Sequence, residues 1–212
     1  MPLSHYVTEA EKKWLFKVAE KYTPWADRDV CLLTFFLGTP CTILELNRVQ
    51  FRDVLTKGGK IAKKFQLEKD DYKGDTRYCY LKNSKIKASI ERYLEALEKE
   101  PFCKGETKQY RGFDPDANFF ITQEGEPFSL TKSNGKFKPD SMKRHIFNMM
   151  KEAGIENPGM DSGRRTFAVN LHRAGIDMSH IHHLLGNKAK KTTQRQLTSD
   201  PINMADIAAR AF

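Results

Sequence analysis

Apolar residues recur at three- and four-residue spacings along much of the chain, which is the periodicity of amphipathic helices. The spacing predicts helices over residues 9–22, 27–37, 42–49, 86–99, 140–153, 166–171, 178–185 and 201–212. In the first of these, Trp14, Leu15 and Val18 form the apolar stripe, and Thr8 with Glu11 makes a capping-box pattern before it. The second is apolar enough to lie at the centre of a core.

The stretches between these helices give weaker signals. Residues 61–81 carry β-forming side chains and a turn signal at 73–75, which predicts two or three short antiparallel strands. Residues 100–117 read as a long polar connection, and 132–138 as a basic loop. The pattern therefore predicts a mainly α fold with a small antiparallel β-sheet (α+β), formed by one domain over residues 1–212.

Composition agrees with a globular protein of ordinary kind. Of the 212 residues, 39% are hydrophobic and 30% are charged, which is typical of a folded domain. No apolar run is long enough to cross a membrane, and the first residues lack the apolar core of a signal peptide. Four widely spaced cysteines form no C-x-x-C pair, so we expect reduced thiols and a cytoplasmic protein.

The charge narrows the range of partners. The formal net charge is +9, with 36 basic against 27 acidic residues, which favours a polyanion but fits a merely basic surface equally well. Basic residues gather in three segments, at 57–64, 132–144 and 188–195. The candidates for contact with nucleic-acid phosphates in these segments are Lys57, Lys60, Lys136, Lys143, Arg144, Lys188, Lys190, Lys191 and Arg195.

Histidines near residue 180 raise the question of a metal site. His180 and His183 share a helical face only as an i, i+3 pair, and no cysteine nearby completes a ligand set. We therefore expect no metal, and we expect His172, His180, His182 and His183 to face solvent or DNA.

The stretch from 160 to 196 carries the strongest functional signal. It reads MDSGRRTFAVNLHRAGIDMSHIHHLLGNKAKKTTQRQ. It resembles the C-terminal signature of the tyrosine recombinases, or phage-integrase family, which runs approximately H-x-x-R-H-T-F-A, a-G-i, L-L-G-H and t-T-x-x-Y. The resemblance extends over nearly the whole chain. Upstream, Glu45, Val49, Asp53 and Val54 are in register with the family's G-x-R-x-x-E-l-x-x-L-x-x-x-D-i.

The resemblance implies the fold of the family's catalytic domain, duplex DNA as partner and no cofactor. Members of the family cut DNA with a tyrosine phenolate while two arginines hold the phosphate. The positions in this chain that match the family's catalytic residues are Thr42, Lys73, Asp161, Arg164, Asn187 and Gln196. Of these, Arg164 is unchanged and Lys73 is the best candidate for the family's hairpin lysine, with Lys69 the next.

The other positions are altered, and the alterations predict that strand cleavage is lost. Gln196 stands where the nucleophilic tyrosine is expected, and Tyr110 is the last tyrosine in the chain. Asp161 replaces a histidine and brings a charge that repels phosphate, and Asn187 cannot transfer protons as a histidine does. Arg165 lies beside Arg164 but points about 100° away on a helix, so it contacts DNA without doubling the clamp.

Three functional hypotheses follow from these observations. The leading one is a catalytically degenerate recombinase domain that binds duplex DNA as an accessory or regulatory component of recombination. The second is an active integrase with a displaced or partner-supplied nucleophile. The third is a protein-interaction module in which the helix at 201–212 binds a second copy or an active recombinase. We expect no counterpart of the family's N-terminal core-binding domain in these residues, which fits either a fragment of a longer recombinase or a stand-alone catalytic half.

Overall fold

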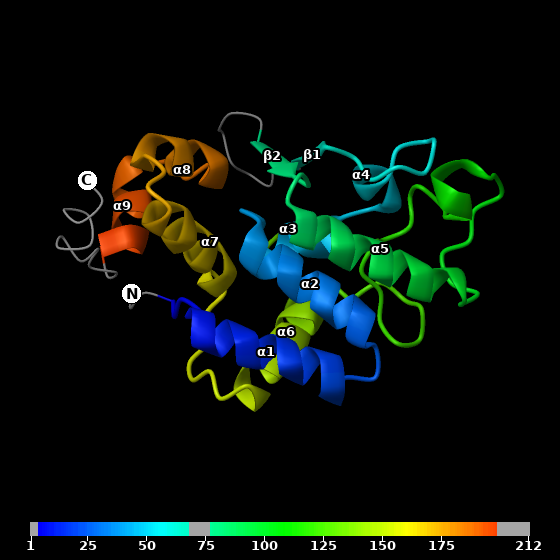
Figure 1. Ribbon diagram of the computed structural model, residues 1–212, viewed down its shortest axis with the longest axis horizontal. Helices are drawn as coiled ribbons and strands as arrows, with labels where there is room; N and C mark the ends of the chain where they lie inside the picture. The colour runs from blue at the N-terminus through cyan, green and yellow to red at the C-terminus, as the bar shows by residue number, and fades with distance from the viewer. Residues whose placement is uncertain (1–3, 68–76, 199–212) are drawn as a thin grey trace.

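The computed structural model describes residues 4–67 and 77–198, and its elements are mostly helices (Figure 1). In chain order they are α1 (Glu9–Tyr22), α2 (Ala26–Gly38), α3 (Ile43–Arg48), α4 (Phe51–Val54), β1 (Lys64–Leu67), β2 (Arg77–Tyr80), α5 (Ser84–Glu98), the short 3-10 helix η1 (Gln109–Gly112), β3 (Thr131–Ser133), β4 (Lys136–Lys138), α6 (Asp140–Glu152), α7 (Ser162–Arg173), α8 (Met178–Leu185) and α9 (Lys190–Thr198). The predicted fold class, mainly α with small antiparallel sheets, is confirmed. The predicted helix at 201–212 lies outside the described residues, as do Lys69 and Lys73.

Helix α1 begins where the sequence predicts. The Thr8 side chain accepts a hydrogen bond from the backbone N–H of Glu11, and the Glu11 carboxylate accepts one from the Thr8 N–H at 2.7 Å. Leu15 and Val18 are buried as expected, but Trp14 is 49% exposed. The buried stripe runs through Leu15, Val18 and Ala19, so Trp14 falls at its edge, where Lys17 lies over the indole ring.

The main core is built around α2, which Figure 1 shows in the middle of the molecule. Nearly every side chain of α2 between 28 and 37 is buried, because α1, α5 and α7 all pack against it. Phe35 meets Phe119 and Phe120 from a later segment, and Tyr93 on α5 stacks parallel to Phe120. Such aromatic contacts contribute large buried areas with specific geometry, and they fix the position of α5.

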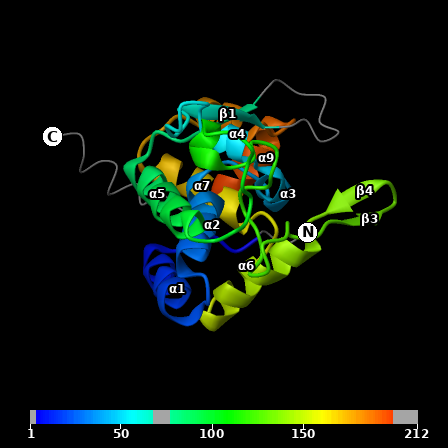
Figure 2. The ribbon, with the colours of Figure 1, turned by 90° about the vertical axis from the view of Figure 1, so that its right-hand side faces the viewer.

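The strands form two separate antiparallel pairs. In the first, β1 pairs with β2 so that Phe65 lies opposite Cys79. In the second, β3 pairs with β4 where we predicted a basic loop, and that prediction was wrong. Asn134 and Gly135 both have positive φ, 52° and 74°, which is the conformation that a two-residue hairpin turn requires. Figure 2 shows this hairpin projecting from the body of the molecule.

Helices α7, α8 and α9 form a lobe with a smaller core of its own (Figure 1). Its buried apolar residues are Ala168, Val169, Ile181, Leu185 and Leu197. Helix α7 joins this lobe to the main core, because Gly163 lies directly against α2: a Cβ there would be 2.2 Å from the Phe36 carbonyl oxygen. No helix in the described part of the chain is long and apolar enough to cross a membrane.

Candidate functional site

Arg164 lies near the start of α7, one residue after the close contact between Gly163 and α2. That contact fixes the depth of the helix and buries Arg164, which is only 8% exposed. Its Nη2 donates to the Leu185 carbonyl oxygen at 2.6 Å and to Oδ1 of Asn187 at 3.2 Å. The guanidinium thus holds the C-terminal end of α8, where a cation also complements the helix dipole.

Asn187 continues this polar network into α9. Its Nδ2 donates to the Thr193 hydroxyl at 2.9 Å and to Oε1 of Gln196 at 3.3 Å. Nδ1 of His182 lies 2.9 Å from the same hydroxyl. Thr193 is fully buried and Gln196 is 7% exposed, so both are held inside the lobe. Three of the predicted positions, Arg164, Asn187 and Gln196, are therefore brought together.

The network also contains two residues that the sequence did not single out for this site. Thr193 carried a signal, because it is the threonine of the family's t-T-x-x-Y motif. His182, which we expected to face solvent or DNA, is half-buried, and its Nδ1 lies within hydrogen-bond distance of the Thr193 hydroxyl. His180 and His183 are exposed, as expected.

Arg77, at the start of β2, reaches the same place from the main body. Its Nη1 donates to the Leu185 carbonyl oxygen at 3.1 Å, and its Nη2 forms an ion pair with the Glu45 carboxylate. The side chains of Arg77 and Glu45 are 16% and 8% exposed. No local sequence pattern identifies Arg77, because its partners are 32 and 108 residues away along the chain.

Thr42 is the N-cap residue of α3, beside this ion pair. Its hydroxyl accepts from the Glu45 N–H at 3.1 Å, and the Thr42 N–H donates to Oε2 of Glu45 at 2.7 Å. Glu45 therefore caps the helix with one oxygen and binds Arg77 with the other. The hydroxyl at position 42 belongs to a helix cap.

Asp161 and Arg165 lie apart from the network in different ways. Asp161 is exposed just before α7, and its side chain makes no cap hydrogen bond. Arg165, which we expected to contact DNA, is only 6% exposed. Its guanidinium donates to the backbone carbonyls of Ser4 and Gln196 and lies over the Tyr6 ring. In this conformation Arg165 fastens the N-terminal segment to α7 and α9.

Most of the other candidates for DNA contact are on the surface. Lys57 and Lys60 are exposed in the turn after α4, Lys136 on β4 and Arg144 on α6. Lys143 is half-buried and pairs with Asp140 at 2.8 Å. The exposed basic residues around α9 are Lys188, Lys190, Lys191 and Arg195. Their roles as DNA contacts stay predictions.

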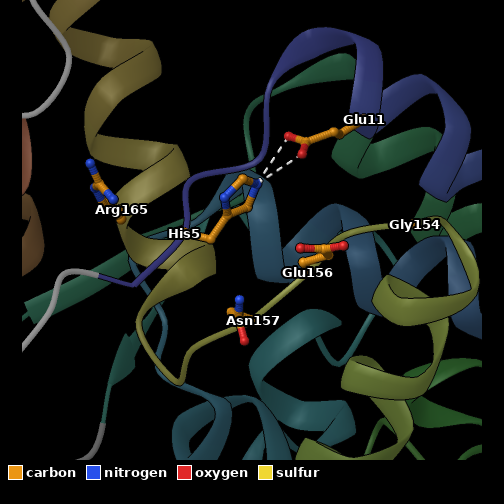
Figure 3. A pocket seen from close by; sticks show the side chains of 6 residues that line it. All are labelled: His5, Glu11, Gly154, Glu156, Asn157 and Arg165. Atoms are coloured by element: carbon orange, nitrogen blue, oxygen red, sulfur yellow. Dashed lines mark hydrogen bonds and ion pairs between the residues drawn. The ribbon is translucent and has the colours of Figure 1, made fainter.

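Two of the cavities between the described residues lie outside the network. The larger, about 570 Å³, is open and polar. Figure 3 shows His5 and Glu11 facing each other at its edge, where Nε2 of His5 lies 2.9 Å from Oε1 of Glu11. Burial raises the pKa of Glu11, but hydrogen bonds from Thr8 and His5 outweigh it, so the pKa lies below the ordinary value. The smaller, about 430 Å³, is lined by Arg28 and His145.

Behind the smaller cavity lies a buried charged cluster. Oδ1 of Asp29 accepts from Arg28 Nε at 2.8 Å and lies 2.7 Å from Nε2 of His145. Burial raises the pKa of Asp29, but hydrogen bonds from His145 and Arg28 outweigh it and hold the pKa below its usual value. Across residues 4–67 and 77–198, no three or more histidine, cysteine or acidic side chains gather as ligands for a metal.

The chain is similar in sequence to a known recombinase. No family model matches the chain. It is 24% identical over 195 residues to tyrosine recombinase XerC of Bacillus pumilus (strain SAFR-032), a match that covers 89% of this chain and 55% of that protein. The chain thus spans about half the length of the curated relative that it matches.

Solved structures agree over almost the whole chain. The crystal structure of XerA recombinase superposes with a TM-score of 0.70 at 19% identity, covering 99% of this chain and 65% of that one. XerH site-specific recombinase, in its post-cleavage complex with a palindromic difH substrate, gives 0.63 at 16% identity, with coverage of 98% and 53%. A lambda integrase dimer bound to a COC′ core site gives 0.60 at 14% identity, with coverage of 96% and 62%.

At these identities the structural matches establish the fold, and the sequence match to the curated recombinase points the same way. The resemblance inferred from the motifs around Arg164 and Glu45 is therefore confirmed. The chain has the fold of a tyrosine-recombinase catalytic domain, and its sequence is similar to that of a curated tyrosine recombinase.

Proposed function

We propose that this protein binds duplex DNA through a recombinase-like domain that has lost strand cleavage, and that it acts as an accessory or regulatory component of recombination. The observation that carries the proposal is the side chain at the nucleophile position. Gln196 is buried, and its amide oxygen accepts a hydrogen bond from Asn187. An amide has no nucleophilic oxygen comparable to a phenolate, and its place in the network is structural.

The neighbouring groups support the loss of cleavage. Asn187 can donate and accept hydrogen bonds but does not change charge near neutral pH, so it cannot transfer a proton to a leaving oxygen. The Thr193 hydroxyl is buried and already bonded to Asn187 and His182. No tyrosine follows Tyr110 in the sequence, so none lies in the segment that carries the family's nucleophile.

DNA binding is supported by three features. The net charge of +9 favours a polyanionic partner, and exposed lysines gather around α9. XerH and lambda integrase, which share the fold, were solved bound to DNA. Loss of a nucleophile does not remove these electrostatic contacts, because phosphate binding depends on cations at the surface.

Binding is tested by fluorescence anisotropy with a labelled random-sequence duplex of roughly 30 base pairs at several salt concentrations. We expect micromolar affinity whose logarithm falls linearly with the logarithm of salt, by about 0.9 for each phosphate contacted. The double substitution Lys190→Gln and Lys191→Gln should lower that slope. The matched control replaces two exposed lysines of α1, Lys13→Gln and Lys17→Gln, and should leave it unchanged. Absence of binding at low salt refutes the proposal.

Cleavage is tested separately on a nicked duplex, on which a covalent protein–DNA product cannot be religated and accumulates. We expect no product that survives denaturing electrophoresis. A covalent adduct would show instead that the protein uses a displaced or partner-supplied nucleophile, and it would identify an active integrase.

A further inference from the structure

Two arginines donate to one backbone oxygen, and one of them, Arg77, lies outside the family's expected positions. Arg164 Nη2 lies 2.6 Å from the Leu185 carbonyl oxygen, and Arg77 Nη1 lies 3.1 Å from the same atom. The two nitrogens can therefore be no further apart than the sum of these distances. One arginine comes from α7 in the small lobe and the other from β2 in the main body.

Contacts with Gly186 and Glu45 determine the direction of the Arg77 side chain. It crosses directly over Gly186, where an added Cβ would lie 1.9 Å from Cδ of Arg77. Gly186 also has a positive φ of 62°, so glycine serves both the end of α8 and the passage of the arginine. At its tip, the Glu45 carboxylate holds Nη2. Arg77 is thus fixed along its length, and little side-chain entropy remains to be lost when a ligand binds.

Such a pair suits an oxyanion. The two guanidinium groups carry two positive charges against the single carboxylate of Glu45, so the group keeps an excess positive charge that a bound anion can neutralise. A guanidinium has five N–H donors, and the hydrogen bonds described for Arg77 use two of its nitrogens. The side chain remains 16% exposed, so a ligand at the surface can reach it. Planar guanidinium groups bind phosphate through pairs of parallel hydrogen bonds.

Arg77 also supplies a positive charge beside the start of α3, where α3 itself has none at residue 42. Thr42 uses its hydroxyl in the helix cap, so no cation comes from residue 42. Glu45, in the first turn of the same helix, instead forms an ion pair with Arg77, which lies on β2. The cation beside the start of α3 is therefore supplied by β2.

We infer that Arg77 and Arg164 together form a phosphate-binding clamp for the DNA backbone, with Glu45 as the residue that positions Arg77. The inference rests on the proposed DNA binding. It adds a specific binding residue that lies outside the family motif. The occupant is one phosphodiester group of duplex DNA, held across the joint between the small lobe and the main body.

The clamp is tested by the salt dependence of duplex binding in three variants of the full chain. Arg77→Gln should weaken binding roughly ten- to a hundredfold, as expected for a charge-assisted contact, and lower the salt slope by about 0.9. Arg77→Lys keeps one charge but loses the fork, so the slope should persist while affinity falls severalfold. The control is Arg92→Gln on α5. Arg92 is half-exposed and also pairs with a carboxylate, that of Asp27, at 2.7 Å. This variant should change neither the affinity nor the salt slope.

The possible outcomes separate the two proposals. If the wild-type protein binds no duplex, the proposed function fails and the clamp falls with it. If the wild type binds and the Arg77→Gln variant, folded by circular dichroism, binds with the same slope as Arg92→Gln, the clamp alone is refuted and Arg77 only supports the fold. Should Arg77→Gln fail to fold, Arg77→Lys decides: wild-type affinity for that variant also overturns the clamp.

Discussion

Gly163 brings α7 into direct contact with the backbone of α2, and its replacement by alanine should destabilise the protein. A Cβ at this position would lie 2.2 Å from the Phe36 carbonyl oxygen and 2.6 Å from the Phe36 ring. Ordinary contact between carbon and a carbonyl oxygen begins near roughly 3.3 Å, so the helices must part by about 1 Å. Neither obstacle can move easily, because Phe36 is buried at the centre of the main core.

Two effects of opposite sign determine how much Gly163→Ala changes the free energy of unfolding. Alanine is favoured over glycine inside a helix by about 1 kcal/mol, which stabilises the variant. Overpacking of a close contact costs about 1–3 kcal/mol and more when backbone is displaced, and separating α7 from α2 also exposes apolar surface along the joint. We expect the second effect to prevail, with a net loss of about 2 kcal/mol and a fall in Tm of about 4–8 °C for a chain of this size.

Urea unfolding followed by circular dichroism measures this change, with Gly38→Ala as the matched control. Gly38 is the last residue of α2, and an added Cβ would meet only Ile86 side-chain atoms at 3.7 Å and beyond. That variant should be neutral or slightly more stable. If Gly163→Ala is as stable as Gly38→Ala, the close docking of α7 on α2 is wrong, and so is the placement of Arg164 that depends on it.

Three further outcomes are expected from the buried polar groups. The pKa of Asp29 is lowered in the folded protein, so the hydrogen bonds of its carboxylate stabilise the fold above the unfolded-state pKa of about 3.9. This contribution disappears as pH falls through the folded-state pKa. The difference in the free energy of unfolding between wild type and Asp29→Asn, measured by urea unfolding, should therefore shrink below about pH 4. Thr193→Val removes a hydroxyl bonded to Asn187 and His182 and should cost about 1–3 kcal/mol in the same assay, whereas no loss would contradict the network. Gln196→Tyr should give no covalent adduct on nicked duplex, because Asn187 cannot transfer protons; an adduct on a denaturing gel would show that the remaining groups suffice for cleavage.

The helices of the main core were predictable because their signals are local. The range 27–37 became Ala26–Gly38, and 140–153 became Asp140–Glu152. The stripe on the latter helix is buried as predicted, at Met142, Ile146, Met149 and Met150. Periodic apolar residues with a glycine or proline at the end leave few alternatives for such segments.

The hairpin at 131–138 was missed although its signal was present. The dipeptide Asn134-Gly135 is the strongest short-range indication of a two-residue turn, but the strands beside it carry lysines in place of apolar residues. All three residues of β4 are exposed, so no buried face imposes the alternation that reveals a strand. The charge of this segment led to its interpretation as a loop.

The candidate site was predicted only where a motif covered it. Arg164, Asn187 and Gln196 occupy motif positions, and they do lie together. Arg77 was missed because its partners come from distant parts of the chain, and such pairings depend on the final packing of lobe and body. The inward turn of Arg165 likewise depends on the N-terminal segment at Ser4 and Tyr6, which no helical spacing could have indicated.

The division of the apolar core into two unequal clusters has a consequence for how the molecule opens. Among the described residues, the lobe of α7, α8 and α9 encloses far fewer buried apolar side chains than the body, so its amide protons should exchange through a partial unfolding that leaves α2 and α5 intact. Arg77 belongs to the body, and Leu185 and Asn187 belong to the lobe. An anion bound across that joint favours the closed state over the partly unfolded one, and it should slow exchange throughout the lobe, including at amides that it never touches.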